Sequence, residues 1–495
     1  MTVTLTSLTT TVAILAVLFT ALVVLSKKHK SIFISYLQSF SGILFIISGF
    51  VKAIDPLGTA YKMDQYFAEF NTVFNGTFLS GISSIFPVLT EYSVAFSVFM
   101  IVFEILLGVM LLFGSLPKLT AWLFMLLVLF FTFLTGFTYL TGYVPSDGQF
   151  FDFSTWGAYK ATNMKVTDCG CFGDFLKLEP KVSFFKDLVL LIPAFLFLFK
   201  TKSMHVLLGS TSRLWINTIV TLGFIYFCMS NYVWKLPVFD FRPFKIGADV
   251  ATQYKKEKEA AGAVRSIART LKNPNTNETQ EISEADYFAN LSKLQEDGWT
   301  TIDQVMSEPA VPKTKISDFQ IKTYDGNDVT DVYLENEKYH FMLISHKIKY
   351  ATENITVIVK DTLMKVDTII AKRDTKYIQR IDTIVDKSVD QVKVTIAADI
   401  LEDYVKDLKG FLDQAVVDGH EISIVLGGAN ENVAKELQKQ LGNANIKIYD
   451  ADDILLKTII RSNPGIVLWK NGKIIYKWHK KQLPPYEKVK AAYLQ

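Results

Sequence analysis

Two cysteines separated by one glycine are the residues of this sequence best suited to chemistry. The motif Cys169-Gly170-Cys171 lies between two long apolar segments. Cysteines this close in an oxidising compartment can form a small, strained disulfide ring, and strained disulfides exchange readily with other thiols. The spacing therefore predicts a reversible redox pair made of Cys169 and Cys171.

The third cysteine, Cys228, leaves two interpretations open. It lies near the outer end of the last apolar segment, where it could act as a resolving thiol for the pair. A lone buried cysteine in a helix is more often a small apolar filler. A metal site is not expected, because the six histidines lie far from the pair in sequence and few ligands are at hand.

Three charged residues fall within or beside the apolar segments. Glu104 interrupts one of them, and a carboxylate at mid-membrane depth is expected to face the bundle interior and to be protonated or paired. It could serve a proton relay or contact a quinone head group, or it could be a neutral hydrogen-bonding group between helices. Lys52 and Asp55 close another segment at its outer end, where we expect an interfacial ion pair with a structural role.

The elements that must position these residues are membrane-spanning helices. Half of the 495 residues are hydrophobic, and up to Trp234 they form long uncharged runs. About 20 helical residues cross the hydrocarbon core of a bilayer. Six spans are predicted, at Thr9–Ser26, Ser31–Val51, Tyr92–Gly114, Leu119–Tyr139, Val182–Phe199 and Leu214–Trp234.

Basic residues in the short loops predict the orientation. They lie in alternate loops, which share one side of the membrane: Lys27, Lys28, Lys30, Lys118, Lys200, Lys202 and Arg213. Cytoplasmic loops carry an excess of Lys and Arg. We therefore expect a multi-pass protein of a bacterial inner membrane, with the N-terminus and everything after Trp234 in the periplasm. Membrane lipid is the expected surrounding, and nothing indicates a nucleic-acid partner.

The long loop at residues 52–91 is rich in aromatic residues and poor in charge. Its aromatics recur about every four residues, which suits an amphipathic helix. Such a helix could lie on the membrane surface, but a cap on the bundle is the interpretation that we favour.

Three stretches resemble a known family. Residues 48–60 (SGFVKAIDPLGTA) and 168–174 (DCGCFGD) resemble the DoxX/MauE-like membrane proteins, and residues 236–247 (LPVFDFRPFKIG) resemble a juncture in their Bacteroidota branch. In that branch the bundle is fused to a thioredoxin-like periplasmic domain. The resemblance implies a DoxX-like four-helix core within residues 1–234, to which the first span is an addition. It also implies a link to disulfide formation, which would fall on Cys169 and Cys171.

The rest of the chain divides into a juncture and linker at residues 235–315 and an α/β domain at residues 316–495. The domain alternates predicted strands and helices, as a thioredoxin-like fold requires. Pro464 precedes a strand, an Asn-Gly hairpin and a second strand, which resembles the closing half of that fold. Pro464 would then match its cis-proline.

This domain departs from a thioredoxin where chemistry would occur. No cysteine follows Cys228, so the domain cannot exchange thiols. An insertion at residues 347–393 stands where Cys-X-X-Cys is expected. Its apolar residues at three-four spacing predict a helical arm, although its Thr, Val and Ile content leaves a strand pair open. The arm could be a docking surface or an embellishment packed on its own domain.

Two functions follow from these features. The first is a scaffold or accessory subunit, whose thioredoxin-like domain and insertion bind a periplasmic or membrane protein. The alternative is an enzyme of the thiol-disulfide oxidoreductase type, using Cys169 and Cys171 with a membrane quinone as a possible cofactor.

Overall fold

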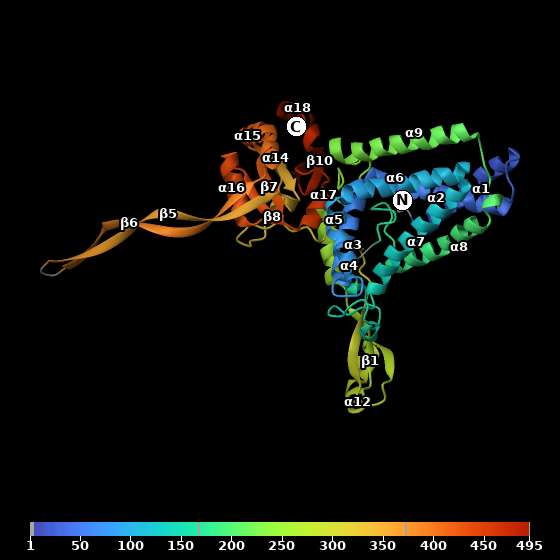
Figure 1. Cartoon of the computed structure of the whole chain (residues 1–495). Coiled ribbons are helices and arrows are strands. Elements are labelled where there is room, and N and C mark those ends of the chain that lie inside the picture. Colours follow the sequence, from blue (N-terminus) through green and yellow to red (C-terminus); the bar gives the residue numbers. More distant parts are fainter. Residues whose placement is uncertain (1–3, 167–168, 372–373, 495) are drawn as a thin grey trace. The chain divides into compact units, whose positions relative to one another are not determined.

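The computed structural model describes residues 4–166, 169–371 and 374–494. The chain forms two compact units, residues 1–242 and 243–495. Figure 1 shows the first as a bundle of long helices and the second as a mixture of strands and helices.

The first unit is built from helices. Among the residues that the structure describes, six helices are long and apolar enough to cross a membrane. Its α-helices are α1 (Leu5–Leu25), α2 (Ile32–Ile54), α3 (Pro56–Phe74), α4 (Ser80–Ser83), α5 (Ile85–Glu91), α6 (Ser93–Phe113), α7 (Pro117–Thr141), α8 (Pro180–Phe199) and α9 (Ser210–Met229), which continues as the π-helical η4 (Ser230–Trp234). Short 3-10 turns are η1 (Phe153–Thr155), η2 (Ala161–Asn163) and η3 (Thr201–Ser203).

The predicted spans are confirmed, and local signals explain their ends. Ser31 caps α2 by accepting a hydrogen bond from the Ile34 N–H. Pro117 and Pro180 occupy the first positions of α7 and α8, where proline is favoured. Gly114 ends α6 in the left-handed conformation that glycine adopts readily.

Helices α2, α6, α7 and α8 pack on one another and form the centre of the bundle (Figure 1). The approach of α2 to α6 depends on two glycines that face each other. A Cβ atom on Gly42 would lie 2.8 Å from the Gly108 carbonyl oxygen, and one on Gly108 would lie 2.7 Å from the Gly42 carbonyl oxygen. Small residues let membrane helices come this close. Helix α1 packs on α2, outside this centre.

The aromatic loop at residues 52–91 folds as the helices α3, α4 and α5. One face of α3 buries Tyr66, Phe67, Phe70 and Phe74 in a cluster with Phe86 of α5 and with Leu134 and Phe137 of α7. The aromatic residues thus pack on the bundle, in agreement with the cap that we favoured.

The second unit has a central five-stranded sheet in the order β10-β9-β4-β7-β8. Strands β4, β7 and β8 are parallel, whereas β9 runs antiparallel to both β4 and β10. The strands are β4 (His340–Ser345), β7 (Glu421–Gly427), β8 (Lys447–Ala451), β9 (Gly465–Lys470) and β10 (Lys473–His479). Phe341 and Leu343 of β4 enter the main core, which also contains Leu437 and Leu468.

Helices accompany this sheet along the chain. They are α10 (Val250–Gly262), α13 (Asp331–Leu334), α14 (Ala398–Leu401), the π-helical η5 (Glu402–Leu408), α15 (Lys409–Val417), α16 (Glu431–Leu441), α17 (Asp453–Ile459), the 3-10 turn η6 (Lys480–Gln482) and α18 (Tyr486–Tyr493). The predicted alternation of strands and helices is present here.

The segment predicted as a linker at residues 235–315 is largely folded. After α10 it forms a small antiparallel sheet in the order β2-β1-β3, with two short helices. These elements are β1 (Ser266–Lys272), β2 (Thr279–Ser283), α11 (Glu284–Ala289), α12 (Leu291–Glu296) and β3 (Thr300–Met306). The sequence does not predict these strands, because they have polar residues on both faces and so lack the alternation of apolar and polar residues that marks a half-buried sheet.

The helix predicted for the insertion at residues 347–393 is wrong, and the strand pair that its composition left open is present. The structure has a two-stranded antiparallel hairpin, β5 (Tyr350–Ala371) and β6 (Asp374–Ile396), paired from Tyr350↔Ile396 to Ala371↔Asp374. Apolar residues at three-four spacing suggested a helix, but Thr, Val and Ile dominate the segment. Their branching at Cβ restricts the side chain in a helix and favours a strand. Figure 1 shows the hairpin extending away from the five-stranded sheet of its own unit.

Candidate functional site

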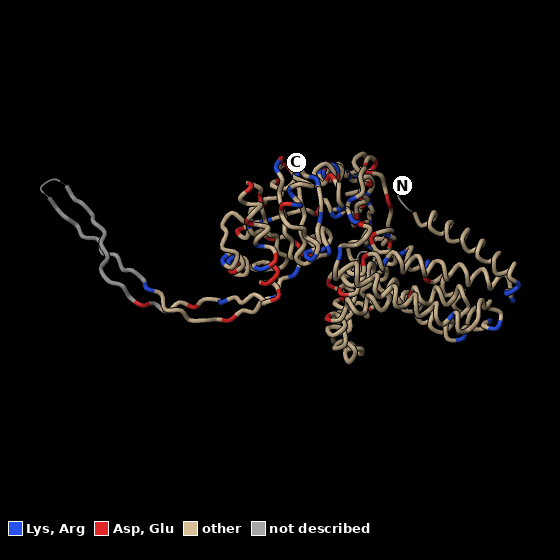
Figure 2. Tube along the Cα trace, turned by 90° about the horizontal axis from the view of Figure 1, so that it is seen from above, with Lys and Arg blue, Asp and Glu red and all other residues tan. Residues whose placement is uncertain are grey.

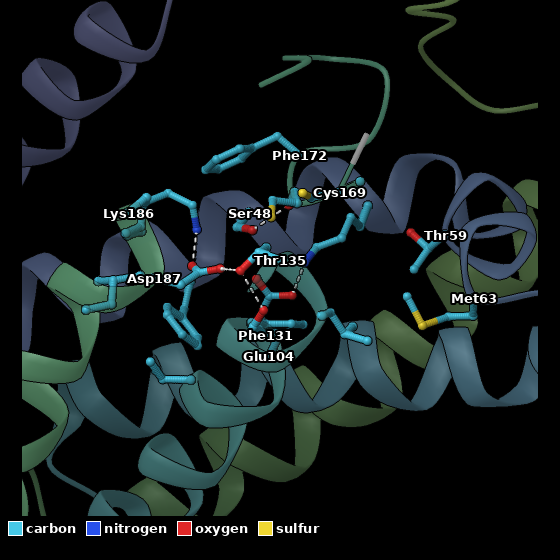
Figure 3. Close-up of a pocket in the computed structure, with 18 residues that line it drawn as sticks. Ser48, Thr59, Met63, Glu104, Phe131, Thr135, Cys169, Phe172, Lys186 and Asp187 are labelled. Atoms are coloured by element: carbon cyan, nitrogen blue, oxygen red, sulfur yellow. Dashed lines mark hydrogen bonds and ion pairs between the residues drawn. The ribbon is translucent and has the colours of Figure 1, made fainter. Parts of the chain in front are cut away.

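The cysteine motif borders a cavity of about 50 Å³ inside the first unit. The walls come from α2, α3, α6, α7 and α8, and the cysteine loop closes one side (Figure 3). Its polar and sulfur-bearing lining residues are Ser48, Lys52, Thr59, Met63, Glu104, Thr135, Cys169, Cys171, Lys186 and Asp187. Most of the remaining wall is aliphatic or aromatic.

Three features fix the cysteine loop on the bundle. Ser48 Oγ of α2 donates a hydrogen bond of 3.0 Å to the Cys171 carbonyl oxygen. Phe172 is buried in the bundle core. Gly170 has a φ of 62°, and a Cβ atom there would lie 3.1 Å from Lys62 Cγ. Glycine between the two cysteines therefore meets both a conformational and a steric requirement.

Lys52 forms a buried ion pair with Glu104, between the C-terminal end of α2 and the middle of α6. The Lys52 ammonium also lies 5.0 Å from the centroid of the Phe131 ring. Glu104 thus faces the bundle interior and is paired, as a carboxylate at this depth requires. The predicted ion pair between Lys52 and Asp55 is wrong. The Asp55 side chain instead caps α3 by accepting a hydrogen bond from the Gly58 N–H.

A second ion pair, which the sequence reasoning missed, joins Lys186 to Asp187 at the same cavity. Thr135 Oγ1 of α7 donates a hydrogen bond of 3.0 Å to Asp187 Oδ2. The Asp187 side chain is only 2% exposed. Two adjacent opposite charges within the apolar span α8 were a readable signal, because charged residues inside spans are rare and usually functional.

The thiol of Cys171 shares the cavity with these four charged groups. Burial raises its pKa above the ordinary value, as do the carboxylates of Asp187 and Glu104, while the ammonium groups of Lys186 and Lys52 lower it. No disulfide joins the cysteines in this structure. The site therefore holds thiols in an environment whose reactivity depends on the balance of the neighbouring charges.

The structure does not bring Cys228 to this cavity. Its side chain is buried with Ala53, Ile101, Val102 and Ile105, between α9 and the α2–α6 pair. This surrounding fits the apolar-filler interpretation rather than a resolving thiol. Pro464 lies in the second unit, directly before β9, and the Asn463–Pro464 peptide bond is cis.

Two cofactor types can be compared with these residues. Over the described parts of the chain, no group of three His, Cys, Asp or Glu side chains is arranged to hold a metal ion. A quinone ring needs more room than this cavity offers, because a cavity that binds benzene has a volume of about 150 Å³. The walls would have to move before a quinone could enter.

Comparison with known proteins places a family domain on part of this bundle. Residues 30–146 match the family described as methylamine utilisation protein MauE. No curated protein and no solved structure matches the chain. The matched region includes α2 to α7, hence Lys52 and Glu104, and ends before the cysteine motif. The chain is therefore similar to the MauE family over residues 30–146, and among its described residues six helices are long and apolar enough to cross a membrane.

Proposed function

We propose that the first unit is a membrane thiol-disulfide oxidoreductase whose redox pair is Cys169 and Cys171. One observation carries this proposal: both cysteines and two lysine–carboxylate pairs line a single cavity. Buried ion pairs are weak devices for stability, since apolar residues of similar size often serve as well. Their convergence on two thiols favours a chemical role.

The proposed reaction is an exchange in which atoms and electrons balance. A thiolate of a substrate dithiol attacks the Cys169–Cys171 disulfide, which breaks as a mixed disulfide forms. The second substrate thiol then displaces the enzyme sulfur. Two electrons and two protons pass from substrate to enzyme, leaving a substrate disulfide and two enzyme thiols. The quinone predicted as an electron acceptor stays a prediction, and the exchange itself does not depend on it.

We further propose that the cysteine loop faces the periplasm of a bacterial inner membrane. Figure 2 places blue Lys and Arg segments at one end of the bundle, among the loops that join α1 to α2, α6 to α7 and α8 to α9. Hydrogen bonds connect helices at this end of the bundle, since Gln38 Nε2 of α2 donates to the carbonyl oxygens of Leu111 in α6 and of His205 in the loop before α9. Clustered basic residues favour the cytoplasm for this end. The loop that carries the cysteines leaves the bundle at the opposite ends of α7 and α8.

The test is the thiol state of the cysteines in cells. Free thiols are alkylated with a mass-tagging reagent before and after reduction, in wild type and in a Cys169→Ser/Cys171→Ser strain. We expect two additional tags after reduction in part of the wild-type population, and slower oxidation of periplasmic thiols in the double variant. Cys228→Ser, outside the cavity, is the matched control and should behave as wild type. Thiols that never change state would refute the proposal.

A second candidate function, binding of an envelope partner by the second unit, rests on the β5–β6 hairpin. An isolated two-stranded hairpin is at best marginally stable in water. Most of its described side chains near the base are exposed, including Ile358, Val359 and Val392. The order β10-β9-β4-β7-β8 supports a thioredoxin-like fold, and the hairpin begins just after β4, where such a fold would carry its cysteines. A scaffold or accessory subunit would use this surface without thiol chemistry.

Removing the hairpin tests this candidate. The Ala397 N–H donates a hydrogen bond of 3.0 Å to the Lys349 carbonyl oxygen, so a short turn can replace residues 350–396. We expect the shortened protein to lose cross-links to neighbouring envelope proteins while its cysteine thiol state is unchanged. An unaltered cross-linking pattern would argue against a docking role for the hairpin.

A further inference from the structure

The two ion pairs at the cavity differ in whether they join separate helices. Lys52 reaches across from α2 to Glu104 on α6, and this pair joins two helices. Lys186 and Asp187 are neighbours on one helix, and their contact ties no elements together. Adjacent residues on a helix do not normally face each other, so the pair forms only because both side chains turn toward the same cavity. Figure 3 shows this arrangement beside Phe172 and the cysteine loop.

We propose that Lys186 and Asp187 form an acid–base couple for Cys171, in which Asp187 exchanges the thiol proton and Lys186 compensates the thiolate charge. This inference rests on the proposed thiol chemistry and assigns these two residues a part in it. Three observations support it: both side chains line the cavity with Cys171, the Asp187 carboxylate is almost fully buried, and Thr135 fixes its second oxygen.

Charge balance explains why a couple is needed. Ionising the partly buried Cys171 thiol adds a negative charge to a cavity with mostly apolar walls, which is costly unless a cation is present. If the proton moves from Cys171 Sγ to Asp187, one negative charge moves from the carboxylate to the sulfur. Lys186 then neutralises the thiolate instead of the carboxylate, and the net charge of the cavity stays constant. In the opposite direction, the protonated Asp187 returns its proton when Cys171 is the leaving thiolate of a disulfide.

Other charged groups face this region and set the background. Lys52 and Glu104 lie on α2 and α6 and neutralise each other. Lys62 of α3 packs beside Gly170, and its ammonium donates a hydrogen bond to Gln65 Oε1. These groups stay unchanged when Lys186 or Asp187 is substituted.

The experiment measures the alkylation rate of Cys171 by iodoacetamide against pH. It uses the full chain in detergent, with Cys169→Ser and Cys228→Ser leaving Cys171 as the one thiol. Lys186→Met removes the compensating cation, so we expect the rate at neutral pH to fall about tenfold and the pH midpoint to rise. Asp187→Asn leaves Lys186 free to pair with the thiolate, so the rate should rise and the midpoint fall. Lys186→Arg should restore a rate close to wild type.

Opposite changes in the two variants distinguish a charge effect from damage to the fold, which would move both rates in one direction. Lys181→Met, an exposed position five residues before Lys186 on α8, is the control and should not change the profile. Equal profiles for wild type and Lys186→Met would overturn the inference, as would parallel changes in Lys186→Met and Asp187→Asn. Because iodoacetamide reports on the thiolate directly, the result does not depend on whether the cysteines cycle in cells. A failure of the proposed oxidoreductase function would appear in the thiol state of the cysteines in cells, not in this alkylation profile.

Discussion

Ser48 Oγ donates a hydrogen bond of 3.0 Å to the carbonyl oxygen of Cys171, which attaches the cysteine loop to α2. The same helix carries Lys52 one turn later, so one element positions both a loop contact and a charge of the cavity. The bond joins residues far apart in the sequence and holds the motif against the bundle.

Replacing Ser48 by alanine should loosen this loop. One lost hydrogen bond is worth about 1 kcal/mol, which corresponds to about a fivefold increase in local opening. We expect faster hydrogen exchange in a peptide that covers residues 169–173, measured by mass spectrometry on the protein in detergent. Ser41→Ala is the matched control, because the buried Ser41 hydroxyl has no hydrogen-bond partner among the residues that the structure describes. Equal exchange in both variants would show that the bond does not hold the loop.

Gly170→Ala should disturb the motif more strongly than Ser48→Ala. A left-handed φ costs a residue with a Cβ atom about 1–2 kcal/mol, and the new methyl group would press on Lys62. We expect Cys169 and Cys171 to change their alkylation rates while the bundle still melts near the wild-type temperature. Gly173→Ala offers a comparison, because Gly173 has a similar φ of 52° but no neighbour within contact distance of an added Cβ atom. If the two variants behave alike, the steric argument at Gly170 fails.

The ion pair of Lys52 and Glu104 predicts a non-additive pair of substitutions. Glu104→Gln leaves a buried ammonium without its counter-charge, and breaking a buried pair in this way costs about 3–5 kcal/mol. Lys52→Met in the same chain removes the stranded charge, so the double variant should recover most of the lost stability. Thermal unfolding in detergent measures both. If the double variant is as unstable as Glu104→Gln, the lost stability does not come from leaving the Lys52 ammonium without its counter-charge.

The sequence allowed the spans to be predicted but not the pairing of charges between them. Apolar runs locate α2 and α6, and Lys52 and Glu104 are unusual charged residues at the end of one run and inside the other. Their contact depends on the rotation and height of one helix against the other, which the close approach at Gly42 and Gly108 sets. The nearest acid to Lys52 in the sequence is Asp55, but the Asp55 side chain caps the next helix.

The hairpin and the second ion pair show two different limits of sequence reasoning. In the insertion, the apolar spacing suited a helix while the β-branched composition suited a strand, and composition was the better guide. At Lys186 and Asp187 the information was present, since adjacent charges in an apolar span are unusual. Their position at the cavity, however, needs the packing of α8 against α7 and the fold of the cysteine loop.

The second unit contains two buried histidines that should make its stability depend on pH. Burial lowers the pKa of His340 to about 4, and burial with the nearby Lys457 and Arg461 lowers the pKa of His346 to about 3. In the unfolded chain both groups titrate near their ordinary value of about 6.5. Between these values the unfolded state binds more protons than the folded state. Stability is therefore fully present above pH 6.5 and falls as the pH decreases toward 4 and then 3.

Urea unfolding of the full chain in detergent, followed by tryptophan fluorescence, tests this dependence. Trp469 and Trp478 are the tryptophans buried in the five-stranded sheet of the second unit. The urea concentration at the unfolding midpoint should decrease when the pH is lowered from 7 to 5. In His340→Gln, which removes one titrating group while keeping a polar side chain near Ser423, the fall should be smaller. His29→Gln in the first unit is the control and should keep the wild-type slope. Carboxylates also titrate at low pH, so the decisive quantity is the difference in slope between His340→Gln and His29→Gln. A histidine that is buried and neutral in the folded state lowers the stability of the protein at acid pH, because the unfolded chain binds a proton there and the folded chain does not. Equal slopes would therefore mean that His340 does not cause the acid sensitivity.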